Sequence, residues 1–156
     1  MKLETILLIP IAYLLIVSVP IMIGNIRESR IKNKYVLPGY LVWLVSATTY
    51  TVLSGDWLNG LVLPLAIGLA LLIAFTMISS SGVVGMGDVK IVILMGLTLS
   101  WKFIPVWLWL PLSVFIIGAL VALYSVFVSK KVKEVIRLGG IIYAVYIAHL
   151  LVLFTN

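Results

Sequence analysis

The chain has 156 residues, of which 63% are apolar and only 10% are charged, with a mean hydropathy of +1.28 and a formal net charge of +6. An ordinary soluble domain is near half apolar and about a quarter charged, so this composition excludes a water-soluble globular fold and predicts lipid as the solvent. The absence of cysteine excludes disulfides, thiolate metal sites and a cysteine nucleophile.

Six apolar runs follow one another along the chain, and most have the length of about 20 residues that a membrane-spanning helix needs. They cover residues 3–23, 37–53, 58–78, 88–100, 104–128 and 137–155. The first run is predicted to be a retained helix, because it is too long for a signal-peptide core and lacks a small-x-small cleavage site. The sequence therefore predicts an all-α fold, with six transmembrane helices in one domain over residues 1–156.

Basic residues gather in and beside the loops that follow the first, third and fifth runs. These loops and their flanks hold nine of the eleven Lys and Arg residues: Arg27, Arg30, Lys32, Lys34, Lys90, Lys130, Lys131, Lys133 and Arg137. Because Lys and Arg are enriched in cytoplasmic loops, these three loops are predicted to face the cytoplasm and both termini to face outside. The net charge is then a signal of topology, and nucleic acid is not expected as a partner.

The fourth run is too short to cross a bilayer. From Asp88 to Trp101, a helix rising about 1.5 Å per residue covers roughly 20 Å of a hydrocarbon core about 30 Å thick. A Ser- and Gly-rich break, residues 79–87, precedes it. Either this Gly-rich break dips below the inner surface of the membrane, or the membrane thins there. Irregular backbone at membrane depth is tolerated only beside protein or a wet cavity. Asp88 is therefore predicted to lie in a water-accessible recess near the cytoplasmic face.

Asp88 is the one acidic residue at the edge of an apolar run beside two glycines, Gly85 and Gly87. An ionisable group at membrane depth is costly and suggests function. The alternative is that Asp88 is a helix N-cap, where Asp is favoured by the positive end of the helix dipole. The glycines likewise allow either an unusual turn or close helix packing.

The stretch Gly85-Met86-Gly87-Asp88-Val89-Lys90 resembles the Gly-x-Gly-Asp motif of type IV prepilin peptidases, which presenilin-type intramembrane proteases share more loosely. The resemblance implies a membrane aspartyl endopeptidase with two catalytic aspartates at the cytoplasmic side. Its substrates would be pilin-like precursors, from which it removes a short basic leader, and its location would be the inner (cytoplasmic) membrane. Since the chain lacks the cysteine-bearing insertion of larger members, it resembles the minimal form, without methyltransferase activity.

Two further segments resemble the family but lack its prolines. Residues 31–33 (Ile-Lys-Asn) occupy the place of the family's Ile-Pro-Asn, and residues 141–148 resemble its segment in helix six. Six residues before Ile31, where the family has its first catalytic aspartate, stands Asn25. The resemblance thus places the catalytic pair at Asp88 and position 25. It gives supporting roles to four other residues: Gly85, Gly87, Lys90 and Asn33.

Asn25 decides whether the chain as written can be active. An aspartyl protease needs one carboxylate to act as a base on water and one protonated carboxyl to polarise the carbonyl, and an amide cannot accept a proton from water. The chain is therefore expected to be inactive. Asn25 is either an engineered Asp-to-Asn change, which the intact motif at Asp88 favours, or a feature of a natural degenerate homologue. It could also be a polar loop residue that closes the first helix.

Two other functions stay open from the sequence. One is a non-enzymatic relative that binds pilin-like helices, and the other is a small transporter that uses Asp88 as an ion or proton site. Lys90 lies two positions from Asp88, a helical spacing that points side chains apart, so it is expected to snorkel to the interface. His149 is interpreted as a hydrogen-bonded residue of the bundle. No cofactor is expected, and no cluster has the spacing of metal ligands.

Overall fold

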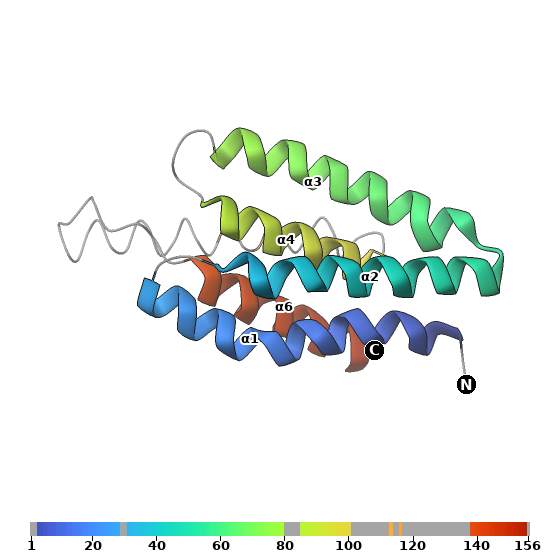
Figure 1. Ribbon diagram of the computed structural model, residues 1–156, viewed down its shortest axis with the longest axis horizontal. Coiled ribbons are helices and arrows are strands. Elements are labelled where there is room, and N and C mark those ends of the chain that lie inside the picture. Colours follow the sequence, from blue (N-terminus) through green and yellow to red (C-terminus); the bar gives the residue numbers. More distant parts are fainter. Residues whose placement is uncertain are drawn as a thin grey trace.

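The computed structural model describes residues 3–28, 31–79, 85–100, 113, 116 and 138–155, and nearly all of them are helical (Figure 1). The elements, in chain order, are the 3-10 turn η1 (Leu3–Leu7), α1 (Leu8–Glu28), α2 (Asn33–Ser54), the π-helical turn η2 (Leu58–Val62), α3 (Leu63–Ser79), α4 (Met86–Leu99) and α6 (Leu138–Thr155). The prediction of an all-α fold is confirmed for this part of the chain. The fifth predicted run, 104–128, lies outside the described residues apart from Ser113 and Ile116.

Three segments are long and apolar enough to cross a membrane: Thr5–Gly24, Asn33–Ser54 and Leu58–Met77. Their outward faces are apolar, since Ile16 is 75% exposed and Met77 is 71% exposed. A soluble protein rarely leaves a large continuous apolar surface in contact with water. The length of these helices and their apolar outer faces are compatible with a membrane protein.

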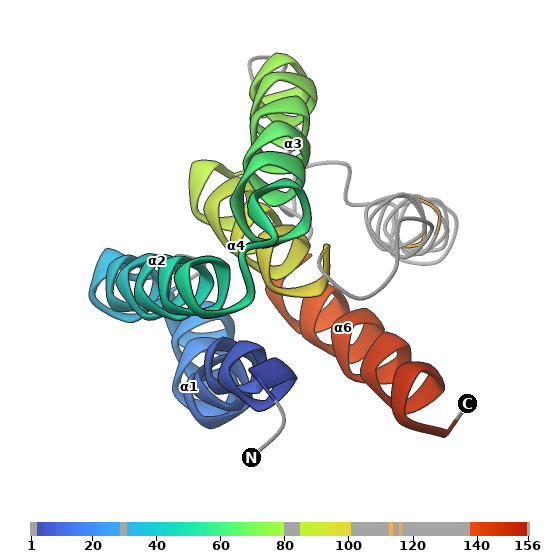
Figure 2. The same ribbon diagram turned by 90° about the vertical axis from the view of Figure 1, so that its right-hand side faces the viewer.

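Helix α4 lies in the middle of the described helices. The end-on view of Figure 2 shows α2, α3 and α6 around it, and α4 contacts all three. Every residue from Ile91 to Ser100 is buried. A helix that is apolar all round is expected to be enclosed by protein or lipid. Its 14 residues make it shorter than its neighbours, as the short fourth run predicted, and the longer helices surround it.

Helices α3 and α4 pack closely where a leucine side chain of each helix lies against a glycine of the other. Leu71 of α3 packs against Gly96 of α4, and Leu97 of α4 packs against Gly68 of α3. A Cβ atom at Gly68 would lie only 2.7 Å from Leu97 Cδ2. Small residues at such positions let membrane helices approach closely.

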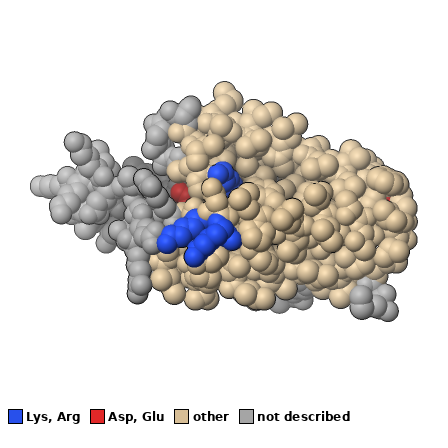
Figure 3. Space-filling model, in the orientation of Figure 1, with Lys and Arg blue, Asp and Glu red and all other residues tan. Residues whose placement is uncertain are grey.

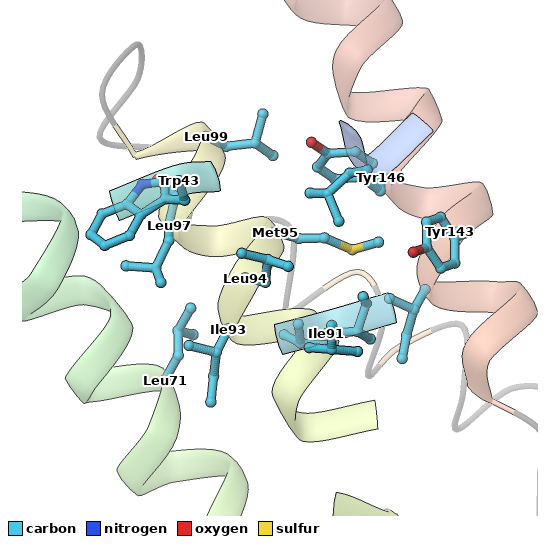
Figure 4. Close-up of a cluster of buried hydrophobic side chains, with 14 of the residues drawn as sticks. Trp43, Leu71, Ile91, Ile93, Leu94, Met95, Leu97, Leu99, Tyr143 and Tyr146 are labelled. Carbon is cyan, nitrogen blue, oxygen red and sulfur yellow. The ribbon is translucent and has the colours of Figure 1, made fainter. Parts of the chain in front are cut away.

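Polar contacts from both sides fix the rotation of α4 (Figure 4). On the α2 side, Trp43 Nε1 donates a hydrogen bond to the Leu97 carbonyl oxygen at 3.1 Å. On the α6 side, the hydroxyls of Tyr146 and Thr98 share a hydrogen bond of 3.2 Å. Because both bonds are buried, they specify which face of α4 meets each neighbour.

The two ends of the bundle differ in charge. Helix α1 ends, and α2 and α4 begin, at the same end of the molecule, while both chain termini lie toward the other half (Figure 1). Among the described side chains, the basic residues are Lys32, Lys34 and Lys90. Figure 3 shows the Lys and Arg side chains on this face gathered near the end where α4 begins.

Candidate functional site

Gly85 is the residue from which α4 begins. Its backbone is extended (φ −73°, ψ 142°), and its carbonyl oxygen accepts hydrogen bonds from the backbone N–H groups of Asp88 and Val89, at 3.0 and 3.2 Å. Gly85 is therefore the N-cap and Asp88 is the third residue of the helix, so the interpretation of Asp88 as the N-cap is wrong. Asp88 is half-buried in the first turn, where the helix dipole favours a negative charge.

Gly87 lies where two segments of the chain approach closely. A Cβ atom at Gly87 would meet the Cβ, N and O atoms of Ile31 at 3.1, 3.3 and 3.4 Å. Two of these three atoms belong to the backbone and cannot move away by a side-chain rotation. At Gly85, by contrast, a Cβ would meet only the Asp88 Oδ2 atom, at 3.4 Å. Gly87 thus lets the start of α4 pack against the connection between α1 and α2.

A recess of about 360 Å³ opens at this point. It is lined by Ile31, Asn33, Gly85, Met86, Gly87, Asp88 and Lys90. The structure therefore brings five of the six residues predicted from the sequence to one place. Ile31 and Met86 also line the recess. They were not predicted as site residues, because an apolar side chain beside a motif carries no chemical signal of its own.

Lys90 turns toward α2. Its Nζ atom donates a hydrogen bond to Asn33 Oδ1 at 3.1 Å, and its own carbonyl oxygen accepts one from the Tyr40 hydroxyl at 2.7 Å. Within the part of the chain that the structure describes, Lys90 and Asp88 form no ion pair. The absence of pairing agrees with the sequence prediction, and the ammonium forms its bond to Asn33 at an exposed position.

Asn25 lies in the last turn of α1. The helix continues to Glu28, past the end of the first predicted apolar run at residue 23, so the interpretation of Asn25 as a loop residue is wrong. Polar residues such as Arg and Glu have good helix propensity and extend the helix beyond its apolar run. The side chain of Asn25 lies outside the described residues. The last turn of α1 lies at the end of the bundle where α4 begins (Figure 1).

Asp56 and His149 belong to local structure rather than to this recess. The exposed Asp56 carboxylate accepts hydrogen bonds from the Asn59 backbone N–H at 3.1 Å and from the Asn59 side-chain amide at 2.9 Å. The side-chain bond, followed by the backbone bond, lowers the pKa of Asp56 below its ordinary value. His149 Nδ1 lies 2.8 Å from the Val145 carbonyl oxygen one turn earlier in α6.

A search of the described residues finds no group of three or more His, Cys, Asp or Glu side chains that could hold a metal ion. Comparison with known proteins finds no matching family model, no similar curated protein and no similar solved structure. The residues around the recess are therefore the features of this chain that indicate a function.

Proposed function

We propose that this chain is the scaffold of a membrane aspartyl endopeptidase of the prepilin peptidase type, with six spans, both termini outside and the recess facing the cytoplasm. The observation that carries the proposal is that Gly85–Asp88 opens the enclosed helix α4 onto a recess beside the connection from α1. Position 25, on the last turn of α1, is at the same end of the bundle. Two helix ends could therefore supply one carboxyl each.

In the active form, aspartates at positions 25 and 88 share one proton, because two adjacent carboxyls do not both ionise cheaply. The ionised carboxylate takes a proton from water as the water oxygen attacks the scissile carbonyl carbon. The protonated carboxyl gives its proton to the carbonyl oxygen, forming a tetrahedral diol. As the C–N bond breaks, a proton passes to the leaving amine. With Asn25 in place, the pair lacks its second ionisable group and hydrolysis stops at the first step.

The position of the recess favours a substrate that changes from polar to apolar at the cut. The recess is lined by the polar side chains of Asn33, Asp88 and Lys90, and the outer faces of α1–α3 next to it are apolar. A pilin-like precursor has this form, with a short basic leader followed by an apolar helix. Its helix would lie among lipid and protein while the leader junction reaches Asp88.

The test compares the chain as written, the Asn25→Asp variant and the double variant Asn25→Asp/Asp88→Asn. Each is incubated with a precursor that has a basic leader, a glycine before the cut and an apolar helix after it. Cleavage by Asn25→Asp alone is the expected result. Cleavage by the chain as written would overturn the role given to position 25. Cleavage by none of them, in folded protein that still binds the precursor, would favour a non-enzymatic relative that binds pilin-like helices.

A further inference from the structure

Lys90 forms hydrogen bonds with α2 through both its side chain and its backbone. The side-chain ammonium bonds to Asn33 Oδ1 at 3.1 Å, and the carbonyl oxygen bonds to the Tyr40 hydroxyl at 2.7 Å. Asn33 and Tyr40 are seven residues apart, so they lie on the same face of α2 about two turns from each other. The position and the direction of the Lys90 side chain are therefore set by α2, although Lys90 belongs to α4.

The bond to Asn33 holds in one place a side chain that is usually mobile near a membrane surface. A lysine there extends its flexible stem toward water, and holding it in one conformation costs side-chain entropy. Lys34 offers a comparison at the same end of the bundle, since its Nζ lies 4.9 Å from the centre of the Tyr35 ring and it does not line the recess. Among the described residues that line the recess, Lys90 is the one with a basic side chain.

The ammonium retains hydrogen-bonding capacity. Lysine has three N–H donors, and Asn33 accepts one of them. The same recess contains the Asp88 carboxyl, and its wall includes Gly85 and Gly87, which have no side chains to fill it. Glycine is used where backbone must approach a ligand closely. The lining thus offers an acid, a cation and side-chain-free backbone, which together complement an extended peptide backbone.

We infer that Lys90 is a substrate-binding residue, held in place by Asn33, that donates a hydrogen bond to a main-chain carbonyl oxygen of the peptide next to the bond on which Asp88 acts. This inference rests on the proposed function. Lys90 then fixes the register of the peptide in the recess, and Asn33 is a positioning residue. A main-chain contact of this kind recognises any sequence in extended form, so specificity for the leader must come from elsewhere.

The first experiment measures binding to the chain as written, which needs no catalysis. A fluorescent precursor peptide is titrated onto Lys90→Met, Asn33→Ala, the double variant and the control Lys34→Met. A charge-assisted hydrogen bond predicts roughly ten- to hundredfold weaker binding for Lys90→Met. A smaller loss is expected for Asn33→Ala, and the double variant should be no worse than Lys90→Met. Lys34→Met, which removes the same charge at the same end, should bind like the parent.

The second experiment separates this role from a purely structural bond between α2 and α4. In the Asn25→Asp background, Lys90→Arg should recover part of the cleavage that Lys90→Met loses, since it restores a cationic donor. A second peptide has a thioamide, which is a weaker hydrogen-bond acceptor, in place of the amide next to the cut. The parent should bind this peptide more weakly than the ordinary peptide, whereas Lys90→Met should bind the two peptides equally. Equal binding by Lys90→Met and Lys34→Met would overturn the inference. If Lys90→Met does not fold, Asn33→Ala is tested with the same two peptides. The thioamide should weaken binding to Asn33→Ala less than it weakens binding to the parent.

The two proposals fail in different ways. If Asn25→Asp cleaves but Lys90→Met binds and cleaves normally, the peptidase function stands and the role of Lys90 is wrong. If Asn25→Asp does not cleave but Lys90→Met weakens peptide binding, the binding role stands and the peptidase function is wrong.

Discussion

A single methyl group at Gly87 tests whether the site depends on the close approach of α4 to the connection between α1 and α2. In Gly87→Ala, the new Cβ would lie 3.1 Å from Ile31 Cβ and 3.3 Å from the Ile31 nitrogen. Carbon atoms prefer separations of about 3.5–4.0 Å, so the two segments must separate by roughly 0.4 Å. Part of what must move is backbone, and a change of rotamer cannot relieve it.

The magnitude follows from two opposing effects. Overpacking of this kind costs about 1–3 kcal/mol, while replacing glycine by alanine within a helix stabilises by up to about 1 kcal/mol. We expect a net loss of about 1 kcal/mol in the free energy of unfolding. Because a misplacement of about 1 Å can cost a hundredfold in rate, a shift of roughly 0.4 Å predicts about a sixfold lower kcat/KM in the Asn25→Asp background.

Gly85→Ala is the matched control. Its Cβ would make an ordinary contact with Asp88 Oδ2, and the extended backbone of Gly85 is allowed for alanine. Alanine is a poorer N-cap than glycine, but it makes the unfolded chain less flexible. These two effects should cancel, so that the free energy of unfolding of Gly85→Ala stays within about 0.5 kcal/mol of the parent. Unfolding in mixed micelles is measured for both variants, and the cleavage rate is measured for Gly87→Ala. If Gly87→Ala is as stable as Gly85→Ala, the close approach of α4 to Ile31 does not constrain residue 87.

Three further predictions concern the fold. The Tyr143 hydroxyl is buried and has no hydrogen-bond partner in the described part of the chain, so Tyr143→Phe should raise the free energy of unfolding by about 1 kcal/mol. Tyr146→Phe removes the hydrogen bond to Thr98 and should lower the free energy of unfolding by about as much. Changes of the same sign in both variants would contradict these roles of the two hydroxyls. Trp43→Phe, which loses a buried hydrogen bond, should lower the free energy of unfolding by about 1–3 kcal/mol, and an unchanged value would contradict the role given to that bond. Cysteine introduced at Lys34 should be labelled from the cytoplasm and cysteine at Asp56 from outside, and labelling of both from one face would exclude the proposed topology.

The sequence located each described helix, and the bounds of α6 to within one residue, but it missed the end of α1 and the start of α2. Hydropathy marks where a helix leaves lipid, whereas the helix itself continues while its polar residues can still form backbone hydrogen bonds. For this reason α1 extends past the apolar run to Glu28, and α2 begins at Asn33 instead of residue 37. The shortness of α4 was predictable from the length of the fourth apolar run. Its enclosure by α2, α3 and α6 depends on tertiary packing, which periodicity does not specify.

The candidate site was predictable where its residues are neighbours in the chain. Gly85, Gly87 and Asp88 form one local motif, and the structure gives the two glycines different surroundings. The bond from Lys90 to Asn33 joins residues 57 positions apart, and no local pattern announces such a contact. The spacing from Lys90 to Asp88 correctly argued against a pair, but it could not identify the partner that Lys90 has instead.

The mass of the product from a precursor incubated with the Asn25→Asp variant tests the central claim most directly. A peptidase of the proposed type should release one leader fragment, whose mass places the cut between the glycine and the apolar helix, and Asp88→Asn in the same background should abolish that fragment. An uncleaved precursor in a sample where binding and folding are intact, or a fragment that persists after Asp88→Asn, would contradict the claim that positions 25 and 88 form one catalytic pair.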